Sequence, residues 1–213
     1  NMTQQARNSR TAHFWERFGC FSADQKRGLR ELQDPVWIHA VSVGEVVAAI
    51  GFIRRWRERA PQQAFVLSTT TTTGHATAQD KLPENCRLIY CPLDFYPFVR
   101  RALNLIAPRM VVIFEVEIWP NLVSLPARRG IPVTLVNGRM SDKSAEGYAS
   151  HRWLFGELFA TFSVFCVQTE TDAERIRRIV GDRVPVHACN TMKFDQAPDK
   201  SVRDQNEVLD KVF

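Results

Sequence analysis

The stretch that decides the fold is residues 110–121, which read MVVIFEVEIWPN. Its first five residues are an apolar run of the length that is typical of a buried strand. Two carboxylates, Glu115 and Glu117, follow the run directly, and Pro120 then stands where a helix can begin, because the first turn of a helix needs no proline N–H. An unbroken apolar strand that leads into a helix is typical of a parallel sheet covered on both faces. The stretch therefore predicts one strand–loop–helix unit of an α/β protein.

The same alternation recurs along the chain. Apolar runs predict seven strands, at residues 36–41, 64–69, 87–91, 110–114, 133–136, 163–167 and 184–188. Helical spacing, capping residues, prolines and glycines predict the intervening helices, at residues 46–56, 73–81, 94–105, 120–130, 145–159 and 171–180. Parallel strands joined by helices form a doubly wound, Rossmann-like α/β sheet, whose ligands bind outside the carboxyl ends of the strands. We expect this domain to span residues 36–195, between a helical segment (1–35) and a linker or peripheral helix (196–213).

Composition excludes several classes of protein. The chain has 213 residues, a net charge of +5, 45% hydrophobic and 24% charged residues, which excludes disordered, collagen-like and coiled-coil chains. No apolar run approaches the roughly 18 residues of a membrane span, and the polar N-terminus is no secretory signal. The five cysteines are odd in number and form no Cys-x-x-Cys pair, which favours free thiols in a reducing compartment. The small positive charge suits an anionic ligand or a membrane surface, and we expect no nucleic-acid partner.

The loop after the first strand carries Ser42, Gly44 and Glu45. Gly44 allows a tight turn, and Glu45 falls in the first turn of a helix, where the helix dipole stabilises a carboxylate. Position alone therefore favours a structural role for Glu45. The alternative is a general base, which works best with a pKa raised toward neutrality, opposite to the effect of the dipole.

Three further loops carry candidate residues. The hydroxyl-rich turn around Thr72 and Gly74 suits an anion or a sugar, although strand-ending threonines and a helix cap explain it equally well. If the backbone stays extended after residue 114, Glu115 and Glu117 point to the same side, and two close carboxylates raise the pKa of one of them. The alternative is that one pairs with an arginine or a helix N-terminus. We also expect Arg139 and Lys143 to contact phosphate, Asp94 to cap the helix that follows it, and His75 to lie on a helix surface.

Several common signatures are missing from the sequence. It contains no Gly-x-Gly-x-x-Gly, Walker or Gly-x-Ser-x-Gly sequence and no His/Cys cluster. The dinucleotide, P-loop and α/β-hydrolase interpretations therefore lack their motifs, and we expect neither a cofactor nor a metal.

Taken together, the loops resemble one family, the bacterial 3-deoxy-D-manno-octulosonic acid (Kdo) transferases of lipopolysaccharide assembly. The resemblance spans about residues 15–195. Its two specific elements are Ser42-Val43-Gly44-Glu45 and the 115–121 loop. The other matching residues are 39–41, Gly74 in its threonine-rich turn, 92–94, 130–132, 137–141, Ser144, Tyr148, Gln168, 172–173 and 193–195.

The resemblance implies the N-terminal, acceptor-binding half of a two-domain GT-B glycosyltransferase. Such enzymes move Kdo from CMP-Kdo to a lipid A precursor, an acylated and phosphorylated glucosamine disaccharide, with inversion and without a metal. It implies that Glu45 is the catalytic base and that Glu115 and Glu117 lie in the active site. The expected substrate-binding residues are Ser42, Gly44, Thr72, Gly74, Asn121, Arg139, Ser141, Lys143 and Lys193.

Three departures from the family pattern stand out. The family usually begins with a hydrophobic anchor, and these 213 residues contain none, although the aromatic residues between 13 and 21 suit a membrane interface. Cys189 stands where a glycine is usual before Asn190, and the donor-binding domain lies outside the sequence. We expect a soluble piece of a protein of the cytoplasmic face of the inner membrane, which folds but transfers no sugar alone. The alternatives are a non-catalytic lipid A or sugar-binding module, or half of another GT-B nucleotide-sugar enzyme.

Overall fold

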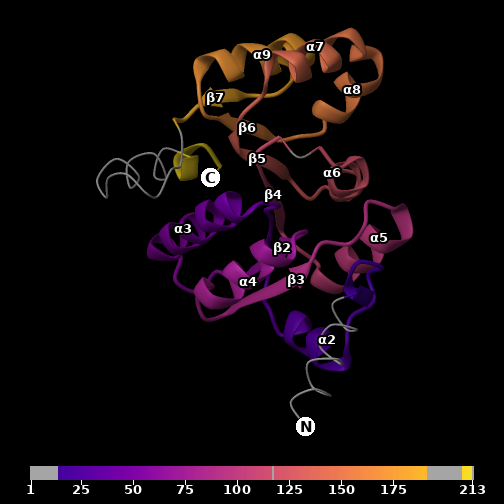
Figure 1. Ribbon diagram of the computed structural model, residues 1–213, viewed down its shortest axis with the longest axis vertical. Coiled ribbons are helices and arrows are strands. Elements are labelled where there is room, and N and C mark those ends of the chain that lie inside the picture. Colours follow the sequence, from indigo (N-terminus) through magenta and orange to yellow (C-terminus); the bar gives the residue numbers. More distant parts are fainter. Residues whose placement is uncertain (1–13, 117, 191–207, 213) are drawn as a thin grey trace.

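The computed structural model describes residues 14–116, 118–190 and 208–212, and its centre is one seven-stranded sheet (Figure 1). The strands are β1 (Val36–His39), β2 (Phe65–Thr69), β3 (Cys86–Tyr90), β4 (Met110–Phe114), β5 (Val133–Gly138), β6 (Val164–Val167) and β7 (Val186–Ala188). All neighbouring strands are parallel, in the order β3-β2-β1-β4-β5-β6-β7. All seven predicted strands and the doubly wound, Rossmann-like fold are confirmed, with ends shifted by one or two residues.

The direction of strand order reverses at the centre of the sheet. β1 pairs with β2 on one side and with β4 on the other, although about 70 residues separate β1 from β4 in the chain. His39 at the end of β1 lies opposite Ile113, so the loops that follow β1 and β4 leave the sheet side by side. In open parallel sheets, this reversal point is where the ligand crevice forms.

Helices cover both faces of the sheet. They are α2 (Ala23–Arg30), α3 (Val43–Arg59), α4 (Thr72–Lys81), α5 (Tyr96–Ile106), α6 (Pro120–Ala127), α7 (Asp142–Ser150), α8 (Arg152–Phe159) and α9 (Glu170–Val180). Alternate strand residues face opposite cores, with Trp37 in one cluster and Ile38 in the other. The first cluster is covered by α2 and α5–α9, and the second by α3, α4 and the helical residues 208–212 (Figure 1). None of the described helices has the length and hydropathy of a membrane span.

The predicted helix over residues 145–159 is wrong in one respect, because it breaks into α7 and α8 at His151. The backbone there leaves the helical region, with φ −109° and ψ 32°. The Ser150 hydroxyl donates to the Gly147 carbonyl (3.0 Å), and His151 Nδ1 lies 3.0 Å from the same oxygen. Side chains thus occupy the carbonyl that would accept the next helical hydrogen bond.

Candidate active site

The loop after β1 forms the first turn of α3 around Glu45. The Ser42 hydroxyl accepts from the Glu45 N–H (3.2 Å), and Glu45 Oε1 accepts from the Ser42 N–H (3.1 Å). Glu45 Oε2 accepts from the Val41 N–H (2.8 Å), and the residue is only 4% exposed. This reciprocal arrangement is a capping box, which confirms the structural interpretation of Glu45. Each carboxylate oxygen has two lone pairs, and the backbone bond that it accepts uses one of them. One lone pair on each Glu45 oxygen therefore remains to accept a proton or a further hydrogen bond.

The backbone beside Glu45 is open to a ligand. Ser42, Val43 and Gly44 are exposed, and Val43 keeps 42% of its surface in solvent. A Cβ at Gly44 would meet only the Ser42 hydroxyl, at 3.9 Å. A bound group can therefore approach the N-terminus of α3 closely, where backbone N–H groups and the helix dipole favour negative charge.

The loops after β1 and β2 are tied together. Thr71 caps α4: its hydroxyl accepts from the Gly74 N–H (3.1 Å) and donates to the Val41 carbonyl (2.9 Å). A Cβ at Gly74 would lie 3.2 Å from that same carbonyl. Gly74 therefore serves close packing between the two loops, whereas Thr72 at the start of α4 is exposed.

Glu115 turns the chain sharply after β4. Its φ is +56°, a left-handed conformation that is strained for a residue with a side chain, and its N–H still donates to the Val136 carbonyl (3.0 Å). The backbone does not stay extended here, so the predicted alignment of Glu115 with Glu117 loses its basis; Glu117 itself lies outside the described residues. Asn137, near the end of β5, and Asn190, after β7, have φ of +56° and +57°. Asp34, Asn85 and Ala107, ahead of β1, β3 and β4, also have positive φ, so this conformation does not by itself mark the site.

Asp94 caps α6 and not α5, which corrects the sequence prediction. Its two carboxylate oxygens accept from the backbone N–H groups of Asn121 (3.0 Å) and Leu122 (2.8 Å). The Asn121 side chain donates to the Asp94 carbonyl (2.7 Å), so this predicted substrate ligand binds the loop before α5. The N-cap of α5, Phe95, makes no side-chain capping bond. The contact spans 27 residues, and capping patterns read from local sequence do not find it.

His39 supports the 115–121 loop from below. It is fully buried, its Nδ1 lies 3.0 Å from the Ser68 hydroxyl, and its ring packs edge-on against Trp119 with 5.7 Å between centroids. Its Nε2 has no hydrogen-bond partner. Burial lowers the pKa of His39 to about 4, although the bond with Ser68 acts in the opposite direction. The ring is therefore neutral at pH 7, and it packs beneath the loop while its Nδ1 contacts Ser68.

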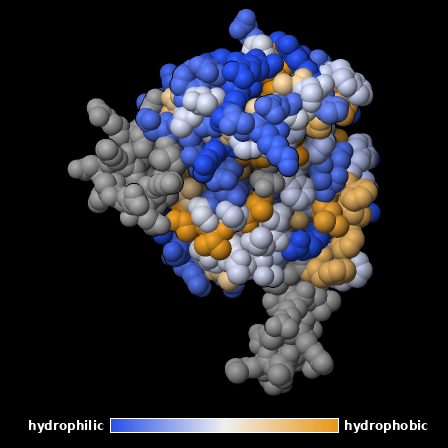
Figure 2. All heavy atoms as spheres, turned by 45° about the horizontal axis from the view of Figure 1, so that its top comes forward, coloured by the Kyte–Doolittle hydropathy of each residue, from blue (hydrophilic) through white to orange (hydrophobic). Residues whose placement is uncertain are grey.

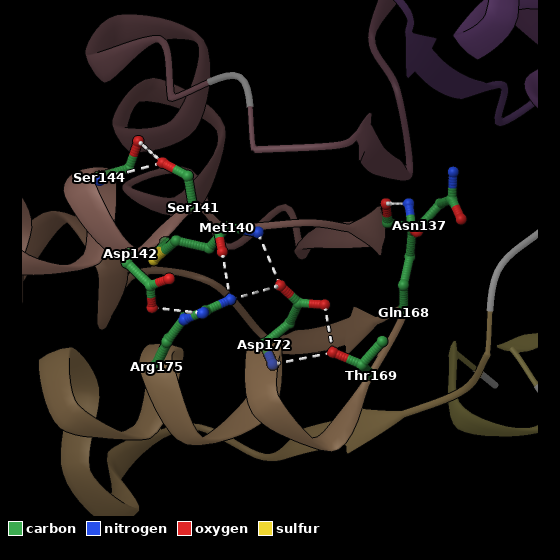
Figure 3. A network of polar contacts seen from close by, with 9 residues as sticks. All are labelled: Asn137, Met140, Ser141, Asp142, Ser144, Gln168, Thr169, Asp172 and Arg175. Carbon is green, nitrogen blue, oxygen red and sulfur yellow. Dashed lines mark hydrogen bonds and ion pairs between the residues drawn. The ribbon is translucent and has the colours of Figure 1, made fainter.

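A buried carboxylate fixes the loop between β5 and α7 (Figure 3). Asp172, 3% exposed, accepts from the Met140 N–H (2.9 Å) and from the Thr169 hydroxyl (2.5 Å). Arg175 donates to the Met140 carbonyl (2.8 Å), lies 3.6 Å from Asp172 and pairs with Asp142. Both polar groups of the Met140 backbone are thus held by α9.

The loop that this network fixes carries Arg139 and Lys143, the predicted anion-binding residues. Arg139 is exposed between two buried neighbours, and Lys143 is exposed in the first turn of α7. Ser141 caps α7, with its hydroxyl accepting from the Ser144 N–H (3.2 Å). The loop therefore carries two cations to the solvent at the carboxyl edge while its backbone stays fixed.

The N-terminal segment contributes contacts that sequence reasoning missed. Arg17 donates to the Thr70 carbonyl (2.7 Å), and its guanidinium lies over the Tyr90 ring, 5.0 Å from the centroid. Glu16 is fully buried and accepts from the Tyr90 N–H (2.6 Å). His75, expected on the helix surface, is buried and stacks on Tyr90 at 3.9 Å. These partners lie up to 74 residues apart, so no local pattern signals them.

Ten of the twelve predicted site residues lie in the described part of the chain, in the loops that follow four strands. They are Ser42, Gly44 and Glu45 after β1, Thr72 and Gly74 after β2, Glu115 and Asn121 after β4, and Arg139, Ser141 and Lys143 after β5. Lys193, like Glu117, lies outside the described residues. Within the described ranges, no group of three His, Cys, Asp or Glu side chains is placed to hold a metal ion.

Comparison with known proteins identifies the family. Residues 12–196 match the family described as 3-Deoxy-D-manno-octulosonic-acid transferase (kdotransferase). The chain belongs to the Kdo transferase family. Residues 42–45 and 115–121, on which the sequence resemblance mainly rests, follow β1 and β4, the neighbouring strands at which the strand order reverses.

Curated relatives of the family match at modest identity. The 3-deoxy-D-manno-octulosonic acid transferase of Haemophilus influenzae is 27% identical over 160 residues, which are 75% of this chain and 38% of that protein. The enzyme of the same name from Rickettsia typhi is 31% identical over 147 residues, 69% of this chain and 32% of that protein. A probable mitochondrial 3-deoxy-D-manno-octulosonic acid transferase of Arabidopsis thaliana is 36% identical over 135 residues, 63% of this chain and 29% of that protein. The matches thus span about a third of each relative.

Proposed function

We propose that this Kdo transferase region is the acceptor-binding half of an inverting, metal-independent enzyme that moves Kdo from CMP-Kdo to a lipid A precursor. The observation that carries the proposal is that two carboxylate-bearing loops follow neighbouring strands where the strand order reverses. Glu45 follows β1, Glu115 follows β4, and the two strands are hydrogen-bonded neighbours. The donor CMP-Kdo is bound mainly by the part of the full-length protein that follows this region.

In the proposed reaction, Glu45 is the general base. The acceptor hydroxyl approaches the open N-terminus of α3 and gives its proton to a free lone pair of the Glu45 carboxylate. Its oxygen attacks the anomeric carbon of Kdo from the face opposite CMP, and the bond from that carbon to the phosphate oxygen breaks, with the electron pair leaving on CMP. Attack opposite the leaving group inverts the anomeric configuration. The phosphate of CMP is a good leaving group, so its departure needs no strong general acid. Removal of the acceptor proton by a base, which typically accelerates a reaction about 10²–10⁴-fold, is then the main proton transfer that the protein must supply.

Charged and hydroxyl groups of the same edge orient the substrates in this proposal. Arg139 and Lys143 are exposed cations on a loop whose backbone is fixed by α9, and they suit the acceptor phosphates. The exposed hydroxyls of Ser42, Thr72 and Ser141 lie at three helix N-termini, where anions and sugar hydroxyls are bound readily. Glu115, Glu117 and Lys193 complete the proposed set.

An aromatic patch supports attachment to the cytoplasmic face of the inner membrane. The patch consists of Phe14, Trp15, Phe95 and Tyr96, which are 56%, 51%, 66% and 50% exposed. Figure 2 shows apolar side chains gathered at the right of the molecule, over the start of α5. Arg100 lies 6.0 Å from the Tyr96 ring centroid, so positive charge accompanies the patch. Aromatic residues beside arginine suit the interface of an anionic membrane, where the lipid acceptor resides.

A transfer assay tests the function. The protein, at the full length of its relatives, is incubated with CMP-Kdo and lipid A precursor, with and without EDTA, and the product is analysed by mass spectrometry and NMR. We expect one or more Kdo residues on the acceptor, inverted anomeric configuration and no effect of EDTA. Absence of a Kdo adduct under conditions where the protein is folded contradicts the proposal, and loss of activity in EDTA contradicts metal independence.

A further inference from the structure

An apolar groove runs along α6 beside the candidate active site. It lies between α6 and α8, holds about 350 Å³, and is lined on the α6 side by Pro120, Ser124 and Arg128. These residues are four apart, so they form one face along the whole of α6, roughly 12 Å at the rise of an α-helix. Leu154, Phe155 and Leu158 line the opposite wall on α8. The volume falls in the range of small-ligand sites.

We propose that this groove holds an acyl chain of the lipid acceptor, an inference that rests on the proposed function. The groove begins at Pro120, which directly follows Trp119 in the 115–121 loop. The groove therefore starts at the loop that carries candidate site residues, which suits a hydrocarbon chain attached to a sugar held at that site. The helices α5, α6 and α8 cover the same core cluster and lie along one side of the molecule (Figure 1). The helices that line the groove therefore cover the same core cluster as α5, whose first residue, Tyr96, belongs to the aromatic patch.

The lining favours hydrocarbon over a polar ligand. Two of the polar residues that line the groove are already bonded within the protein: Glu157 pairs with Arg183 (2.7 Å), and the Thr161 hydroxyl donates to the Leu158 carbonyl (2.6 Å). The apolar wall, in contrast, leaves Leu154 53% exposed. Burying apolar surface there is favourable, at about fourfold in affinity for each methylene that leaves water.

The test compares two acceptors with the same head group, the acylated lipid A precursor in detergent micelles and its fully deacylated form. Binding of each to the full-length protein is measured by calorimetry, and transfer is measured beside it. Leu154→Glu places a charge in the groove at an exposed position, and Ser124→Leu fills the groove without a charge. Trp153→Glu is the matched control, because Trp153 neighbours Leu154, is 79% exposed and does not line the groove.

We expect Leu154→Glu and Ser124→Leu to weaken binding of the acylated acceptor by tenfold or more and to leave the deacylated acceptor unchanged. Trp153→Glu stays within about threefold of wild type. If Leu154→Glu and Trp153→Glu weaken binding equally, the acyl-chain proposal is wrong and the protein adheres to the micelle in a general way. If binding is unchanged in both Leu154→Glu and Ser124→Leu, the proposal is also wrong. If the wild type binds the acylated acceptor through the groove but transfers no Kdo, the proposed reaction fails and the groove stands.

Discussion

Acidification should destabilise this protein through His39. The side chain is fully buried, and its pKa is lowered from 6.5 to about 4 by that burial. Below pH 6.5 the unfolded chain takes up a proton on this ring, whereas the folded chain does not until the pH approaches 4. Because the unfolded state binds more protons in this window, the free energy of unfolding falls as the pH is lowered.

The size of the effect follows from the difference between the two pKa values. At pH 4.5 the unfolded ring is almost fully protonated and the folded ring is mostly neutral. The linkage relation then gives a loss of about 2 to 3 kcal/mol between pH 7 and pH 4.5. This is a large fraction of the roughly 5–15 kcal/mol that holds a domain folded.

Urea unfolding from pH 7 to pH 4.5 measures the effect in the wild type and in His39→Phe. The phenylalanine ring keeps an aromatic contact with Trp119 and cannot titrate, and carboxylates common to both proteins cancel in the difference. We expect the wild type to lose about 2 to 3 kcal/mol more than His39→Phe over this range. Parallel pH profiles for wild type and His39→Phe would refute the reasoning.

Two further predictions concern the loops around the site. Asp94→Ala removes the acceptors of two backbone N–H groups of α6, and we expect the free energy of unfolding to fall by about 2–4 kcal/mol in urea titrations. A loss below 0.5 kcal/mol would show that the cap is dispensable. Gly74→Ala places a Cβ 2.8 Å from the Thr71 hydroxyl and 3.2 Å from the Val41 carbonyl, so we expect a loss of about 1–3 kcal/mol. Gly147→Ala, on α7, is the control: its Cβ meets no atom within 4 Å, so the free energy of unfolding should rise by about 0.5–1 kcal/mol. Thermal unfolding of both variants measures the difference. Equal shifts in the two variants would count against a packing role of Gly74.

The strands follow from local patterns, and the doubly wound sheet follows from their alternation with helices. Each of the first six apolar runs is followed by a helix, and right-handed crossovers then leave few possible arrangements. The sequence also placed Glu45 in the first turn of a helix, but the capping box itself was not predicted, although Ser42 and Glu45 have its three-residue spacing. The split of the predicted 145–159 helix was not foreseen, because it depends on which side chains bond to the Gly147 carbonyl.

The parts of the site that sequence reasoning missed depend on long-range contacts. Asp94 stands beside α5 in the chain, yet the sheet brings it to α6, whose N-terminus has no capping side chain of its own. His75 has the polar character of a surface residue, yet Tyr90 on the neighbouring strand covers it. Arg17 reaches Thr70 only because the N-terminal segment packs on the edge of β3. Such pairings are set by tertiary packing and leave no local pattern.

The most direct test of the central claim separates the two roles of Glu45. Glu45→Gln keeps an oxygen that accepts from one backbone N–H of the capping box but places an amide against the other, so we expect a stability loss of about 1–3 kcal/mol and a folded protein. The amide cannot take a proton from the acceptor, so Kdo transfer by the full-length protein should fall by at least about 100-fold. Transfer by folded Glu45→Gln within a few-fold of wild type would contradict the account, because Glu45 would then be a helix cap alone.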